Sequence, residues 1–152
     1  MRYNLYCISK ADSQELVEDF VMKCRGFGAQ LLIHDVFNNA IAKAQKISAA
    51  KAQESYSKAL TSFVKHTPSH LSIALTPSAK MLDSHEFANL IANYQEVSFF
   101  IGGAYGFSSD FLRSLKTLSL SPLTLSHKIA KIVLCEQIYR ALSIMTNHPY
   151  HK

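Results

Sequence analysis

The chain lacks several features that mark particular classes of protein. No hydrophobic run approaches the roughly 20 residues that a helix needs to cross a bilayer, and residues 1–10 do not have the pattern of a signal peptide. The three cysteines, Cys7, Cys24 and Cys135, are not spaced like metal ligands and lie among apolar neighbours. We therefore expect a cytoplasmic protein with no membrane segment and no metal site, whose cysteines pack in its core.

Charged residues are also scarce, at 18% of the 152 residues, whereas hydrophobic residues make up 48%. This composition is typical of a folded chain with a substantial core and excludes a disordered one. We found no internal repeat, low-complexity tract or linker. The length suits one core, so we expect a single domain over residues 1–152.

The formal net charge of +5 is unevenly distributed. Basic residues outnumber acidic ones in two blocks, residues 38–66 and residues 107–152, and the first block contains a single acid, Glu54. Such blocks are equally typical of phosphate-binding surfaces and of solvated helix faces. If the partner is RNA, we expect Lys128 and Lys131 to contact its phosphates.

Hydrophobic spacing predicts strands and helices in alternation. The expected strands are residues 3–9, 30–37, 71–75, 97–101 and 118–120. The expected helices are residues 12–26, begun by Asp12 or Ser13 as the cap, 39–64, 83–95, 111–115 and 127–145. The helix over residues 39–64 has little apolar surface and should be largely exposed. The alternation predicts an α/β fold with a mostly parallel sheet.

The last expected helix has apolar residues on two faces. One face carries Ala130, Leu134, Ile138, Ala141, Leu142 and Met145, and the other carries Ile129, Ile132 and Val133. A helix enclosed in one large core would show the same pattern. In so short a chain, we favour a homodimer that covers the second face.

Two segments have the composition of a ligand site. Gly102 and Gly103 follow a buried strand directly, at the edge where parallel sheets bind ligands, although a simple tight turn would look the same. Residues 118–127 alternate apolar and hydroxyl side chains, which suits either a loop around an adenine ring or a strand followed by a helix cap. Residues 147–152, Asn-His-Pro-Tyr-His-Lys, concentrate polar and aromatic groups where a frayed end is usual.

The C-terminal quarter of the chain resembles a known family. Residues 119–125, His127, Glu136, residues 139–144 and the ending 146–151 are similar to the C-terminal signature of the large-subunit ribosomal RNA methyltransferase H family. The resemblance is close over about the last 35 residues, extends back to Leu71 and includes the length and element order of the whole chain.

The resemblance implies a fold and an activity. The family belongs to the SPOUT superfamily. The resemblance therefore implies a mostly parallel α/β sheet with a C-terminal trefoil knot, which the hydrophobic periodicity of the sequence would not suggest. It also implies S-adenosylmethionine as cofactor and methylation of N3 of a pseudouridine in 23S rRNA. The cofactor residues it implies are Leu75, Gly102, Gly103, Ser121, Pro122, Leu123, Thr124, Leu125 and Ser126. The chain departs from the family at Thr76 to Lys80, and at Ala104-Tyr105, where many relatives have Pro-Glu.

Candidate catalytic residues follow from the implied reaction. The N3 imide attacks well only after it loses its proton, so a base is needed. His127 is the candidate base, His148 and Tyr150 could hold the target base, and Arg140 could stabilise the developing negative charge. Simpler roles are a helix cap for His127 and an ion pair with Glu136 for Arg140. We expect the ending, including His148 and Tyr150, to complete the site of the other subunit.

Other functions fit parts of the pattern. A non-catalytic ribosome-binding or RNA-binding assembly module would also be small and basic, and cofactor binding distinguishes it from an enzyme. The same fold could act on transfer RNA, although the ending argues against it. A metal enzyme does not fit, because the seven histidines are scattered.

Overall fold

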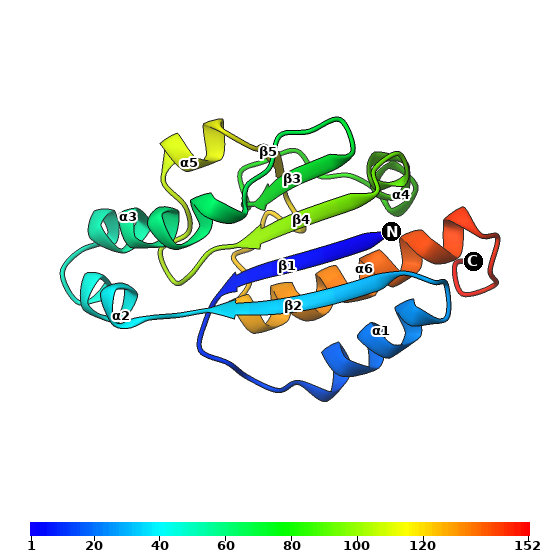
Figure 1. The fold of residues 1–152 in the computed structure, drawn as a ribbon, viewed down its shortest axis with the longest axis horizontal. Helices are drawn as coiled ribbons and strands as arrows, with labels where there is room; N and C mark the ends of the chain where they lie inside the picture. Colours follow the sequence, from blue (N-terminus) through cyan, green and yellow to red (C-terminus); the bar gives the residue numbers. More distant parts are fainter.

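Five parallel strands form one sheet in the order β2-β1-β4-β3-β5 in the computed structural model, which describes residues 1–152 (Figure 1). The strands are β1 (Arg2–Ile8), β2 (Gln30–Val36), β3 (His70–Leu75), β4 (Glu96–Ile101) and β5 (Lys116–Leu118). The central strand β4 is an almost continuous apolar run, as expected for a strand covered on both faces. The predicted α/β fold with a mostly parallel sheet is confirmed, and all five carboxyl ends lie along one edge.

Helices cover both faces of the sheet (Figure 1). One layer consists of α1 (Glu15–Arg25), α6 (His127–Met145) and α4 (Ser84–Ala92), with α6 between the other two. The other layer covers the carboxyl half of the strands and consists of α2 (Asn39–Gln45), α3 (Ala49–Leu60), the short 3-10 helix η1 (Thr61–Phe63) and α5 (Ser109–Arg113). None of these helices has both the length and the hydrophobicity needed to cross a lipid bilayer.

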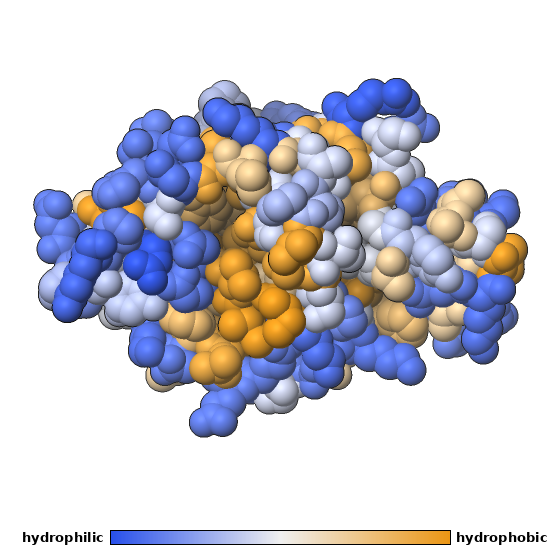
Figure 2. Space-filling model, turned by 180° about the vertical axis from the view of Figure 1, so that it is seen from behind, coloured by the Kyte–Doolittle hydropathy of each residue, from blue (hydrophilic) through white to orange (hydrophobic).

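The helix α6 begins and ends at the predicted residues. Leu134, Ile138 and Leu142 on its inner face are buried against the sheet and its neighbours. Ile129 keeps 48% of its surface exposed, and Ile132 and Val133 are only half-buried. Apolar side chains gather on this side of the molecule (Figure 2). Part of the second apolar face is therefore left without a partner within the chain.

The prediction of one exposed helix over residues 39–64 is wrong. Ser48 interrupts the helix, because its hydroxyl accepts a hydrogen bond from the Lys51 N–H, 3.1 Å away, and so begins α3 as an N-cap. The two shorter helices are also not largely exposed. Ile41, Tyr56 and Leu60 are fully buried against the strands beneath them.

The predicted start of α1 is also wrong. The residue before the helix is Gln14, which makes no side-chain capping bond. Asp12 instead forms an ion pair with Lys128 of α6, with 2.9 Å between Oδ2 and Nζ, and the Ser13 hydroxyl donates to Glu18. Asp12, which the local sequence suggests as the cap, is thus engaged in an ion pair with a distant segment of the chain.

The three cysteines are buried, as predicted. Burial raises the pKa of the Cys7 thiol, and it raises the pKa of Cys24 and of Cys135 to about 12. All three therefore stay protonated at neutral pH and pack as small apolar side chains.

Candidate active site

A cavity of about 360 Å³ lies at the carboxyl ends of β3 and β4. Three segments that are distant in the sequence form its walls: the end of β3 with Thr76 and Pro77, the turn over residues 101–106, and residues 120–127 with Ala130 of α6. Its size falls in the range of small-molecule sites, about 300 to 1,000 Å³.

The glycines after β4 let the chain pack closely at this edge. A Cβ atom on Gly102 would lie 3.1 Å from the Gly106 Cα, and one on Gly103 would lie 2.6 Å from the phenol ring of buried Tyr56. Gly106 has a φ of +65°, which side chains disfavour. The turn therefore presents backbone rather than side chains to the cavity.

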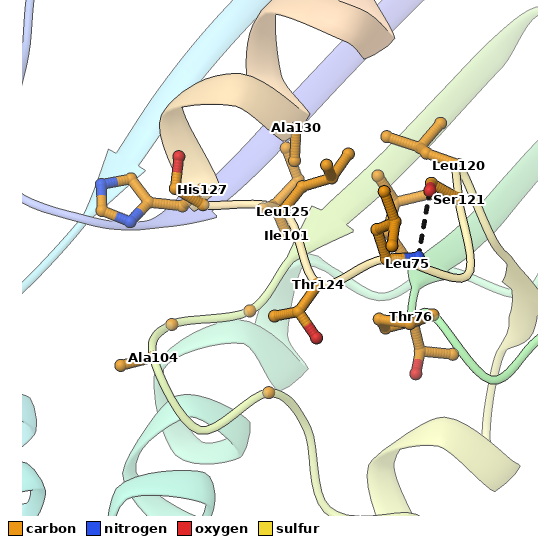
Figure 3. A pocket seen from close by; sticks show the side chains of 16 residues that line it. Leu75, Thr76, Ile101, Ala104, Leu120, Ser121, Thr124, Leu125, His127 and Ala130 are labelled. Carbon is orange, nitrogen blue, oxygen red and sulfur yellow. Dashed lines mark hydrogen bonds between the residues drawn. The ribbon is translucent and has the colours of Figure 1, made fainter.

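Residues 120–126 form the opposite wall, and hydrogen bonds hold them in place. The buried Ser119 hydroxyl bonds to the Ser121 carbonyl at 2.9 Å, and the Leu123 N–H donates to the Ser121 hydroxyl at 3.0 Å (Figure 3). The Ser126 hydroxyl accepts from the Ile129 N–H and so caps α6. Figure 3 shows the Thr124 side chain directed from this wall toward the glycine turn.

His127 is the first residue of α6 and is partly buried. It does not cap the helix, because Ser126 has that role. Its ring points away from Leu125 and Ala130, toward the ends of the neighbouring strands (Figure 3). His127 therefore stands at the border of the cavity, beside the predicted cofactor loop.

The other three candidate catalytic residues lie elsewhere in the chain. Arg140 is 13 positions beyond His127 on the same helix, which places it about 20 Å farther along the axis. His148 and Tyr150 follow that far end of the helix, at the opposite end of the sheet from the cavity (Figure 1). One copy of the chain does not bring these three residues together with His127.

Residues 147–152, the C-terminal tail, fold back on α6. The Tyr150 hydroxyl donates to Glu136 Oε1 at 2.9 Å, and Arg140 Nε donates to the same oxygen at 3.0 Å. The Arg140 guanidinium lies 4.8 Å from the centre of the Tyr150 ring, and His151 Nδ1 is 3.3 Å from Arg140 Nη1. Burial, followed by the bond to Glu136, raises the pKa of Tyr150. The tail and the side chains of Glu136 and Arg140 therefore form one polar cluster that contains a guanidinium cation and a phenol.

The cavity contains all the residues predicted to bind the cofactor except Pro122, which belongs to the loop but does not line the space. Sequence reasoning missed other lining residues, namely Thr76, Pro77, Ile101, Ala104, Gly106, Leu120 and Ala130. Most of them lie next to a predicted strand end or to the glycine pair. This position in the sequence was the signal that could have identified them.

The prediction that Lys131 contacts RNA is wrong. Its side chain is buried, and Nζ lies 2.6 Å from Oδ1 of Asp35, which also accepts from the Ser9 hydroxyl at 2.9 Å. Lys128 points outward and pairs with Asp12. No three His, Cys, Asp or Glu side chains are grouped so that they could hold a metal ion.

The structure is a parallel α/β fold with a cavity of small-molecule size at the carboxyl edge of its sheet, between a glycine turn and a hydrogen-bonded loop. Residues 1–151 match the family model described as a predicted SPOUT methyltransferase. The chain belongs to the SPOUT methyltransferase family, which confirms the resemblance seen in its last quarter.

Similar proteins extend over the full length of the chain. It is 52% identical to the ribosomal RNA large subunit methyltransferase H of Wolinella succinogenes and 49% identical to that of Helicobacter hepaticus, in each case over 100% of both chains. Among solved structures, a probable methylase family protein from Haemophilus influenzae aligns with a TM-score of 0.55 at 14% identity, covering 99% of this chain and 70% of that one. That likeness concerns the fold alone.

Proposed function

We propose that the protein is an S-adenosylmethionine-dependent methyltransferase that methylates N3 of a pseudouridine in the 23S rRNA of the large ribosomal subunit. The observation that carries the proposal is the cavity, in which Leu75, Gly103 and the loop over residues 121–126 meet. The names of the full-length relatives support the choice of RNA. If the protein instead acted on transfer RNA, its methylated product would be a transfer RNA. If it were a non-catalytic assembly module, there would be no methylated product.

The walls of the cavity suit the cofactor. Leu75, Ile101 and Leu125 offer apolar surface for an adenine ring, and the glycine turn and the loop over residues 121–126 expose backbone groups for its polar edge. When bound there, S-adenosylmethionine supplies an electrophilic methyl group. The chain's own contribution is to hold that group in a fixed orientation between two walls.

His127 is our candidate to accept the N3 proton, because it borders the cavity and its ring is directed away from Leu125 of the adjoining cofactor loop. Arg140 of α6 and Tyr150 of the tail would bind the substrate from a second copy of the chain. Two observations support this arrangement: about 20 Å of helix separates the tail from its own cavity, and Ile129 beside that cavity is left exposed. A homodimer that pairs the α6 faces would cover Ile129. The trefoil knot of the family stays a prediction.

Calorimetry with S-adenosylmethionine tests the cofactor assignment. Thr124→Trp should fill the cavity and abolish binding, since Thr124 is exposed and directed into it. Thr67→Trp is the matched control, because Thr67 is also exposed but does not line the cavity. If the folded wild-type protein gave no heat with the cofactor, the enzyme assignment would be wrong.

Mass spectrometry of rRNA nucleosides tests the product. A strain without the protein should lose 3-methylpseudouridine from 23S rRNA and regain it with the wild-type chain. Unchanged 3-methylpseudouridine would contradict the proposed reaction.

Complementation tests the shared site. Deleting residues 149–152 should preserve cofactor affinity and reduce methyl transfer by orders of magnitude, because the substrate loses a positioning group. A mixture of this deletion with full-length Thr124→Trp, each inactive alone, should recover activity in heterodimers that contain one intact site. A strictly monomeric wild type, or a fully active deletion, would refute the shared site.

A further inference from the structure

A second cavity, of about 430 Å³, lies beside the cofactor cavity at the carboxyl ends of β1 and β2. Ala104 and His127 line both cavities. The ring of His127 is directed away from Leu125 and Ala130, toward the ends of the neighbouring strands (Figure 3), and it also lines this second cavity. The two cavities are therefore neighbours with a common wall, and the candidate base is part of that wall.

The inner walls of the second cavity combine an apolar surface with one oriented hydrogen-bond donor. Ile8 and the half-buried ring of Phe37 provide the apolar part. The Oε1 atom of Gln45 accepts from the Tyr56 hydroxyl at 2.8 Å, which fixes the carboxamide and leaves its NH2 group without a protein acceptor. A free amide donor beside an apolar wall suits a flat heterocycle that carries carbonyl oxygens.

The rim of the cavity is positively charged. Lys10 is exposed and has no carboxylate within 4.0 Å, and its Nζ rests 5.5 Å from the centre of the Phe37 ring. Lys128, also on the rim, is partly neutralised by Asp12. Lys10 is thus the rim cation that is free to meet a phosphate, and a base that enters the cavity brings its own phosphates with it.

We propose that this second cavity receives the target pyrimidine of the RNA. Phe37 lies against the ring, the Gln45 carboxamide donates to a carbonyl oxygen next to the reacting nitrogen, and Lys10 contacts an adjacent phosphate. His127, which lines both cavities, then stands beside the reacting nitrogen, where it can accept the N3 proton without blocking the path to the methyl donor. This inference rests on the proposed function and assigns substrate residues within the same site.

Gln45→Glu is the sharpest test, because a carboxylate keeps the acceptor for Tyr56 and removes the donor. We expect kcat/KM for ribosomes purified from a strain lacking the enzyme to fall at least about tenfold, as for a lost bond to a bound polar group. Cofactor affinity by calorimetry should stay within about twofold of wild type. Gln30→Glu is the matched control: it has the same charge change and retains the bond from Arg2 Nε (3.2 Å), far from both cavities, so its kcat/KM should be unchanged.

Lys10→Gln provides a second measurement that does not depend on the packing around Tyr56. Because one phosphate contact is removed, the slope of log affinity for the same ribosomes against log salt should decrease by about one. Wild-type kcat/KM in Gln45→Glu, together with an unchanged salt slope in Lys10→Gln, would overturn the assignment of this cavity. Absence of methyl transfer to RNA by the wild type would instead overturn the proposed function.

Discussion

Lys131 and Asp35 form an ion pair that is almost wholly shielded from water. Their side chains are 1% and 14% exposed, and Nζ lies 2.6 Å from Oδ1. Replacing Lys131 by Met keeps the apolar stem and leaves a shielded carboxylate with only the Ser9 hydroxyl as partner. Removing one member of such a pair costs about 3 to 5 kcal/mol. We expect the lower part of this range, about 3 kcal/mol, because Asp35 retains Ser9 and some contact with water.

The neighbouring lysine is a matched control. Lys128 is on the same helix and pairs with Asp12, but these side chains are 57% and 34% exposed. Lys128→Met should therefore cost much less stability than Lys131→Met, because water already screens this exposed pair. Adding Asp35→Asn to Lys131→Met should recover most of the lost stability, because the uncompensated charge is removed.

Urea unfolding followed by circular dichroism measures these differences, with the free energy of unfolding extrapolated to water. A loss of about 3 kcal/mol is a large share of the 5 to 15 kcal/mol typical of a domain, so it shifts the midpoint clearly. If Lys131→Met were no more destabilising than Lys128→Met, or if Asp35→Asn failed to rescue it, the stabilising role of the buried pair would be refuted.

Three further changes have defined outcomes. Gly103→Ala should lower stability by about 1 to 3 kcal/mol in thermal melts, because the new Cβ would meet the buried Tyr56 ring at 2.6 Å; an unchanged melting temperature would contradict this. Asp83→Ala should cost about 1 kcal/mol in urea, because it removes the capping box of α4. Burial lowers the pKa of His70 in the folded chain. Below a pH of about 6.5 the unfolded chain therefore binds a proton more readily than the folded chain does, and stability decreases as the pH decreases. His70→Gln should make the decline between pH 7 and 5.5 shallower, and an identical pH profile would refute the assignment.

The sheet and the last helix could be predicted from the sequence because their signals are local. Residues 97–101 are a continuous apolar run, and α6 has a serine cap at its start and a proline soon after its end. The break between α2 and α3 was missed because it contains no glycine or proline. Its only signal is Ser48, and serine also occurs within helices.

The candidate site was predictable only in part. The glycine turn and the loop over residues 121–126 stand out as continuous segments, whereas the wall at Thr76 and Pro77 depends on β3 lying next to β4. The pair of Lys131 with Asp35 joins residues 96 positions apart. Lysines on helices are usually exposed, which is why the sequence suggested a surface role for Lys131. The available signal against that role was its position beside Ala130, Leu134 and Cys135, which are all buried.

The burial of all three thiols makes the protein convenient for site-specific labelling. Thiol reagents attack the thiolate, and Cys7, Cys24 and Cys135 are both inaccessible and held protonated. A cysteine introduced at the exposed Lys152 would then be the single reactive sulfur in the native chain. A spin label or fluorophore attached there would report the position of the tail while all three natural cysteines stay in place.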